Sequence, residues 1–120
     1  MRFFLPFPPS SNNYRVPVRG RLILSAKARE YYVAAAVALQ QQGFRKWDGT
    51  PERVEVTIEI QAPDRRRRDI ENFVKPAIDA VVKAGLIDDD SQIDDLRIIR
   101  GPQYAGGRVW VTVTEMACAS

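Results

Sequence analysis

The sequence predicts one domain, residues 1–120, of the α/β (α+β) class: a small mixed β-sheet packed by two main helices, in the order β-β-β-α-β-α-β-β. Three observations carry this prediction. Apolar and polar residues alternate strictly over 54–61, two other stretches repeat apolar residues with a helical period, and glycines and prolines separate these segments. A length of 120 residues with 45% hydrophobic content suits one globular core.

The first quarter of the chain is expected to contribute strands. Residues Arg2–Phe7 are predicted to form a short strand that ends at Pro8-Pro9. The polar segment Ser10–Arg15 is predicted to be a loop able to touch a ligand. Residues Val16–Leu24 are predicted to form two short strands around Arg19-Gly20.

The first helix is expected to begin after Ser25, a good N-cap residue, and to run to about Gln42. Gly43 is the expected stop. One buried face is predicted from the apolar residues Tyr32, Val33, Ala36, Val37 and Leu39.

The second half of the chain is expected to hold a strand, a helix and two further strands. The alternating strand 54–61 ends at Ala62-Pro63, and the helix that follows closes at Gly85. Pro76 interrupts this helix, because it removes a backbone donor, and predicts a kink or an unusual first turn. Leu96–Arg100 and Arg108–Thr114 are the last predicted strands. A right-handed crossover would join strand 54–61 to the strand after the helix.

Composition excludes several kinds of active site. The chain has no histidine, so neither a Ser-His-Asp triad nor a histidine-bound zinc site can form. The single cysteine, Cys118, cannot form an internal disulfide, and there is neither a long apolar run nor a signal-peptide pattern. A reducing cytoplasm and no membrane partner are the expectation. The net charge is only +3, yet arginine makes up most of the basic residues, which suits bidentate phosphate contacts.

The segment from Asp64 to Lys75 concentrates opposite charges. Four arginines, Arg65–Arg68, run directly into Asp69 and Glu71. Arginines alone suggest phosphate binding, whereas bare carboxylates repel a phosphate backbone. A metal ion between acids and phosphate would reconcile the two, which suggests a metal-dependent enzyme acting on nucleic acid.

A simpler interpretation of these acids stays open on the residues alone. Asp69 is a good N-cap, and Glu71 would favour the first helical turn. Glu71 and Lys75 also form a helical i,i+4 pair. Asp88-Asp89-Asp90 follow the same helix, where they are either a solvated loop or acids offset by a cation. A helix of about 15 residues spans about 22 Å, so an aspartate of this loop reaches Asp69 only if the chain doubles back.

The ordered motifs resemble the RusA family of Holliday junction resolvases over nearly the whole length. The central residues that carry the resemblance are Arg65–Arg68, Asp69-Ile-Glu71-Asn72, Lys75, Lys83-Ala-Gly-Leu and Asp89-Asp90-Ser-Gln92. The outer ones are Leu5-Pro-Phe-Pro-Pro-Ser10 with Asn12-Asn13, Gly106-Gly107-Arg108 and Thr114-Glu115-Met116.

The resemblance implies a dimeric, magnesium-dependent endonuclease that cuts four-way DNA junctions in symmetric pairs and is often encoded by prophages. It implies that Asp69, Glu71 and Asp90 are the acidic, metal-binding and catalytic site, and that Lys75 is a catalytic lysine. Asp90 is preferred over Asp88 and Asp89 because it directly precedes Ser91-Gln92. Glu71 departs from the aspartate expected at this position, so metal distance and flexibility could change. The resemblance also implies that the chain doubles back so that Asp90 reaches Asp69, and the kink at Pro76 would contribute to this.

The resulting hypothesis assigns a role to each group. Mg²⁺, with Mn²⁺ as a substitute, would be held by the three acids, whether as one ion or two, and no other cofactor is expected. Lys75 would offset charge on the reacting phosphate, and Arg65, Arg66, Arg67 and Arg68 would follow neighbouring phosphates. Asn12, Asn13, Tyr14 and Lys27 are candidate DNA contacts, or else turn-forming and surface polar residues. The partners would be branched DNA and a second copy of the chain. A non-catalytic nucleic-acid-binding module and a nuclease for flaps, duplex DNA or RNA are the rival functions.

Overall fold

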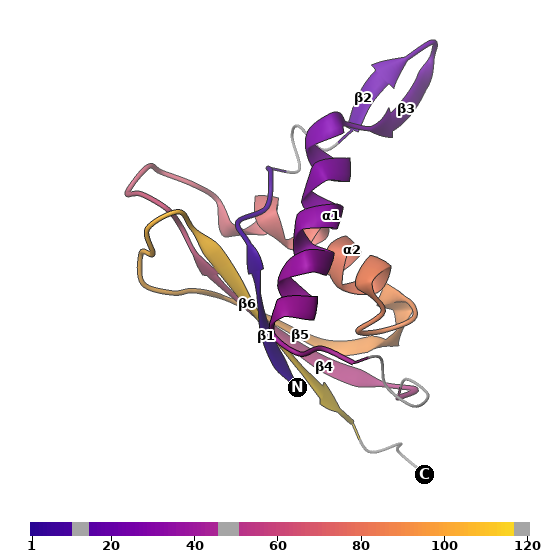
Figure 1. Ribbon diagram of the computed structural model, residues 1–120, viewed down its shortest axis with the longest axis vertical. Helices are drawn as coiled ribbons and strands as arrows, with labels where there is room; N and C mark the ends of the chain where they lie inside the picture. The colour runs from indigo at the N-terminus through magenta and orange to yellow at the C-terminus, as the bar shows by residue number, and fades with distance from the viewer. Residues whose placement is uncertain (11–14, 46–50, 117–120) are drawn as a thin grey trace.

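The computed structural model describes residues 1–10, 15–45 and 51–116, and it contains the predicted mixed sheet and two helices in the predicted order (Figure 1). Four strands form the main sheet in the order β1-β6-β4-β5. Their bounds are β1 Arg2–Pro6, β4 Val54–Gln61, β5 Ile93–Arg100 and β6 Arg108–Glu115. The central strand β4 pairs antiparallel with β6 and parallel with β5, which is what makes the sheet mixed.

The core lies between one face of this sheet and the helices α1 (Ala26–Gln41) and α2 (Val74–Ala84). Strand β4 buries Val54, Val56, Ile58 and Ile60, as its alternation predicts. The neighbouring strand β6 buries valines at 109, 111 and 113 on the same face. The side chains that alternate with these point to the other face of the sheet.

Helix α1 begins as predicted but buries a different face. Ser25 caps it, since its Oγ accepts a hydrogen bond from Ala28 N at 3.2 Å. The buried residues are Ala28, Tyr31, Ala35 and Leu39, whereas the predicted set included Val33, which is 66% exposed, and Val37, which is 46% exposed. The prediction was wrong because alanines occur all around this helix, so its sequence contains two adjacent apolar stripes and does not show which of them is buried.

Helix α2 has the unusual first turn that Pro76 predicts. A 3₁₀ turn, η2 (Ile70–Phe73), leads into α2, and Pro76 is buried near the start of the helix. Gly85 ends α2 with a left-handed φ of 87°, a conformation that favours glycine. A crossover joins β4 to β5, because β4, α2 and β5 follow one another and the two strands are parallel; its predicted right-handedness stays a prediction.

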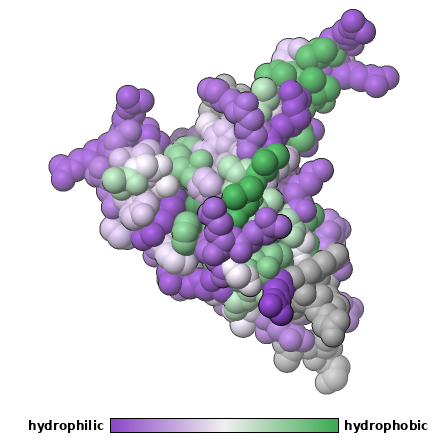
Figure 2. All heavy atoms as spheres, viewed as in Figure 1, coloured by the Kyte–Doolittle hydropathy of each residue, from purple (hydrophilic) through white to green (hydrophobic). Residues whose placement is uncertain are grey.

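A β-hairpin projects from the body of the molecule next to the start of α1 (Figure 1). It consists of β2 (Arg15–Val18) and β3 (Arg21–Leu24), and its turn residues Arg19 and Gly20 both have positive φ, as a tight hairpin requires. Figure 2 shows apolar atoms gathered on this hairpin and along the body below it. The exposed apolar side chains of the hairpin are Val16, Val18, Leu22 and Ile23. An isolated two-stranded hairpin is marginally stable, so packing of these exposed apolar side chains against another surface would stabilise it.

No helix within the described residues is both long and apolar enough to cross a membrane.

The two faces of α1 predict different costs of truncation. Leu39→Ala should lower the free energy of unfolding by about 2–5 kcal/mol, because it leaves a cavity under the helix. Val33→Ala should change it by less than about 0.5 kcal/mol in the monomer. Urea unfolding of both variants checks this. A large loss for Val33→Ala that grows with protein concentration would mean that another molecule covers the exposed stripe.

Candidate active site

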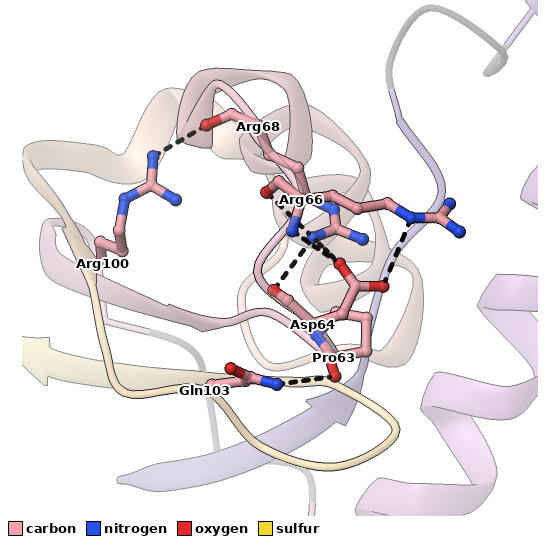
Figure 3. A network of polar contacts seen from close by, with 6 residues as sticks. All are labelled: Pro63, Asp64, Arg66, Arg68, Arg100 and Gln103. Atoms are coloured by element: carbon pink, nitrogen blue, oxygen red, sulfur yellow. Dashed lines mark hydrogen bonds and ion pairs between the residues drawn. The ribbon is translucent and has the colours of Figure 1, made fainter.

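The arginine run forms a tight turn around the carboxylate of Asp64 (Figure 3). Asp64 Oδ1 accepts hydrogen bonds from Arg66 N at 3.0 Å and from Arg68 Nη1 at 2.7 Å. The hydrogen bond from Arg68 is the main reason why the pKa of Asp64 is lowered from its ordinary value. Arg100 Nη2, at the end of β5, donates to Arg68 O at 2.8 Å and so attaches the turn to the sheet.

This turn divides the four arginines into two roles. The side chain of Arg68 is only 17% exposed, because it points inward to Asp64. Arg65, Arg66 and Arg67 are exposed. The inward arginine therefore holds the turn, while the outward three are placed for contacts with phosphates outside the chain.

Asp69 follows this turn and lines a pocket with two of the arginines. It occupies the N-cap position of η2, yet within the described chain its carboxylate makes no capping hydrogen bond. The pocket measures about 400 Å³ and is lined by Ser10, Arg67, Arg68, Asp69 and Asn72. An exposed carboxylate that is not used for capping, in a pocket lined by two arginines, is an arrangement that can hold a metal-bound phosphate.

Two residues of this pocket were absent from the predicted site. Ser10 arrives from the N-terminal segment after two prolines, and Asn72 follows Glu71 in η2. Asn72 was visible as part of the central motif, and Ser10 begins the loop that was predicted to touch a ligand, although no local pattern places Ser10 at this pocket. Its position depends on long-range contacts: Tyr31 Oη donates to Pro6 O at 2.7 Å, and Phe7 lies 4.8 Å from Phe73 between ring centroids.

Glu71 and Lys75 lie close to Asp69 in sequence but do not pair as a helical i,i+4 pair would. Glu71 is exposed in η2, and Lys75 lies in the first turn of α2. Lys75 Nζ bonds instead to Asp79 Oδ1 at 3.3 Å, and its side chain remains 58% exposed. Such an exposed lysine can leave this ion pair at little cost to bind a phosphate.

The three aspartates after α2 differ in their surroundings. Asp89 caps the short 3₁₀ turn η3 (Asp90–Gln92) in a capping box with Gln92. Ser91 Oγ donates to Asp89 Oδ2 at 2.7 Å, and this bond is the main cause of the lowered pKa of Asp89. Asp90 is exposed on the same turn. The carboxylate of Asp89 is thus engaged in local structure, and the choice of Asp90 as the functional acid stays a prediction.

Within one chain the structure places Asp90 far from Asp69. Asp90 directly precedes β5, whose first residue, Ile93, pairs with Val54. Arg100, the last residue of β5, contacts the backbone of Arg68 next to Asp69. Eight residues of strand span roughly 23 Å, so the two acids lie at opposite ends of β5. The doubling back of the chain that the resemblance implied does not occur within one protomer.

Of the remaining predicted DNA contacts, the structure describes Lys27. Lys27 is exposed in the first turn of α1 and lines a shallow groove beside Pro6–Pro9. This segment leads directly to Ser10 at the pocket. Asn12, Asn13 and Tyr14 lie outside the described residues.

The acids near the pocket suit a hard cation in number and chemistry. Among the residues that the structure describes, no three acidic, cysteine or histidine side chains converge to hold a metal. Asp69 and Glu71 supply two carboxylates from one short segment. Magnesium is commonly held by one or two carboxylates together with substrate phosphate oxygens and water, so these two residues fit it.

The sequence is similar to known proteins over nearly its whole length. The family model described as endodeoxyribonuclease RusA matches residues 6–114. The crossover junction endodeoxyribonuclease RusA of Escherichia coli (strain K12) is 41% identical over 112 residues, which cover 93% of this chain and 92% of that protein. Its namesake in Enterobacteria phage 82 has the same identity and coverage, and that of Enterobacteria phage HK97 is 34% identical over 96% of this chain and 94% of its own. The chain belongs to the RusA endodeoxyribonuclease family.

Proposed function

We propose that this chain is a magnesium-dependent endonuclease that resolves four-way DNA junctions by paired incisions. The observation that carries the proposal is the pocket in which Asp69 lies beside Arg67 and Arg68. The relatives named crossover junction endodeoxyribonucleases support the choice of a branched DNA substrate. Sequence-independent phosphate contacts by the exposed arginines suit recognition of DNA shape.

Residues of the pocket and of the adjoining segment have separate roles in this proposal. Asp69 and Glu71 would hold the metal, which, when bound, polarises the scissile phosphate and supplies an activated water. Arg67 binds the phosphate group that enters the pocket, Arg68 beside it stays paired with Asp64 and holds the turn, and Asn72 can donate a hydrogen bond to one of the phosphate oxygens. Lys75 leaves Asp79 to offset the negative charge that develops on the reacting phosphate.

The proposal includes a homodimer in which Asp90 serves the site of the partner. A two-fold axis perpendicular to α2 brings the start of one α2 next to the end of the other, so Asp69 and the partner's Asp90 meet at the same end. The exposed stripe of Val33 and Val37, together with the hairpin, provides apolar surface for such a dimer. Two sites related by a two-fold axis also suit the approximate two-fold symmetry of a four-way junction.

The protein should cleave a four-way junction in the presence of Mg²⁺ and leave a linear duplex of the same sequence intact. The reason is that the exposed arginines recognise the arrangement of phosphates, and cutting needs the metal that the acids hold. Denaturing gels of end-labelled substrates, with Mg²⁺, with Mn²⁺ and with EDTA, measure this. Binding without any metal-dependent cutting would identify a non-catalytic module. Equal cutting of duplex, flap or RNA would identify a nuclease for another substrate.

Asp69→Asn should reduce junction cleavage by roughly 10³-fold or more, on the scale of removing a group that stabilises charge in the transition state. Binding of the junction should persist or tighten, because the lost carboxylate repels phosphate. Cleavage rates and fluorescence anisotropy separate the two effects. Asp95→Asn, at an exposed aspartate of β5 outside the site, is the matched control and should cleave normally. An equal loss of binding and cutting in Asp69→Asn would instead indicate a structural cap.

Mixed dimers test the assignment of Asp90 to the partner's site. A purified heterodimer of an Asp69→Asn chain and an Asp90→Asn chain should regain nicking, because one of its two sites then contains both acids. Each homodimer should remain inactive. The heterodimer of Asp69→Asn with Glu71→Gln is the control and should stay inactive, because these two acids belong to the same segment. An inactive Asp69→Asn/Asp90→Asn heterodimer would place Asp90 outside the partner's site.

A further inference from the structure

A row of arginines and aromatic rings occupies the face of the sheet that the helices do not cover. Its members, here called the arginine–aromatic row, are Arg2, Phe4, Tyr104, Arg108 and Trp110. The guanidinium carbon of Arg2 lies 4.1 Å from the centre of the Trp110 ring, and that of Arg108 lies 3.7 Å from the centre of the Tyr104 ring and 5.1 Å from Trp110. Phe4 meets Trp110 edge to face at 5.3 Å.

Strand register explains why these side chains share one face. In β6 the buried residues Val109 and Val111 face the helices, so Arg108 and Trp110 face the other way. Phe4 pairs with Trp110 across the β1–β6 ladder. The row is therefore built on rigid strands, and only Tyr104 comes from the loop between β5 and β6.

The stacking leaves the positive charge of these arginines available. An arginine stacked on an aromatic ring keeps its planar N–H edge at the rim of the ring, in a fixed orientation that suits phosphate. Arg108 also donates from Nε to Gln61 Oε1 at 2.5 Å, which fixes it further. The ion pairs formed among the described residues engage other cations: Arg53, Arg66, Arg68 and Lys75. Glu59 lies on the same face, opposite Trp110 in the β4–β6 ladder, and its carboxylate accepts from Gln61 Nε2 at 3.2 Å; among the described residues it forms no ion pair with Arg2 or Arg108.

The row is continuous with the arginine turn of the active site. Tyr104 N donates to Ala62 O at 3.0 Å, and Gln103 Nε2 donates to Pro63 O at 3.4 Å (Figure 3). A hollow of about 250 Å³ lies between the two loops. Its lining includes Arg65, Arg66, Arg100 and Gln103. Arginines thus follow one another from the pocket of Asp69, past this hollow, to Arg108 and Arg2, and the carboxylate of Asp64 that also lines the hollow is paired with Arg68.

We propose that the arginine–aromatic row binds the phosphate backbone of a DNA arm that leaves the active site around this edge of the sheet. The inference rests on the proposed action on branched DNA, and it adds a second binding surface, separate from the acidic pocket. Charge complementarity favours DNA as the molecule that binds here, because the row carries two stacked cations. The exposed apolar side chains that would suit contact with a second copy of the chain lie elsewhere, on α1 and the hairpin. Tyr104, at 43% exposed, offers a ring edge beside the sugar–phosphate chain.

Arg108→Gln and Arg2→Gln should each weaken binding of a four-way junction by roughly three- to tenfold. Each should also reduce the slope of log K against log[salt] by about 0.9, because each variant loses about one phosphate contact. Fluorescence anisotropy in EDTA from 50 to 200 mM KCl measures both quantities. Arg29→Gln, on α1 at the other face of the sheet, removes the same charge and should leave both unchanged.

Several outcomes decide the proposal. Unchanged affinity and slope in both variants would overturn it. A change of sedimentation behaviour, with the affinity of the dimer for DNA unchanged, would overturn it in favour of a subunit contact. If Arg108→Gln unfolds, Arg108→Lys replaces it in the test. This variant keeps the charge without the planar guanidinium and should bind the junction with intermediate affinity. If it binds the junction as tightly as the wild-type protein, the proposal is overturned. Because binding is measured without metal, a protein that binds the junction through these arginines yet cuts no DNA would refute the proposed function and uphold this surface.

Discussion

The parallel pairing of β4 and β5 is the constraint on which the rest of the site depends. A parallel pair needs a crossover, and here the crossover is α2 together with its two flanking turns. The acids that precede α2 and the acids that follow it are therefore held at opposite ends of β5. No local rearrangement can unite them without breaking this pairing. A site that needs both groups must draw one of them from a second chain, so the topology of one protomer argues for a dimer.

The carboxylate of Asp64 holds the arginine run in one fixed turn. Four adjacent guanidiniums repel one another, and a turn containing them would otherwise open. Asp64 draws Arg68 inward and accepts from the backbone of Arg66, while Arg100 binds the backbone carbonyl of Arg68. The turn therefore presents the remaining arginines outward in a fixed arrangement beside Asp69. Because the pKa of Asp64 is lowered, this anchor keeps its charge at neutral and mildly acidic pH and is lost only as the pH falls through that lowered pKa.

Local patterns predicted the elements of this fold well, and long-range packing decided what they could not predict. Alternation fixed β4, and Pro76 and Gly85 marked the ends of α2, because these signals lie within a few residues. The buried face of α1 was mispredicted, since it depends on which stripe the sheet and α2 happen to cover. The loop that begins at Ser10 was predicted to touch a ligand, but its position beside Asp69 could not be predicted, because Tyr31 and Phe73 hold this segment from far along the chain. The contacts of Arg108 have two sources: alternation along β6 places Trp110 on the same face, and the turn from Tyr104 to Gly107 brings the Tyr104 ring to Arg108.

The separation of binding and acidic groups over this fold matters for selectivity. A phosphate group has the same chemistry in a linear duplex and in a junction, so the pocket of Asp69 alone cannot favour a branched substrate. Contacts remote from the reacting phosphate can favour a branched substrate, provided that only a branched DNA reaches these contacts and the pocket at the same time. Arg108 and Arg2 lie on the open face of the sheet, on a surface separate from the pocket of Asp69, so a DNA that reaches both surfaces engages more cations than one that reaches the pocket alone. Selectivity would then come from how many cations a DNA shape can engage at once, with no need to recognise a base.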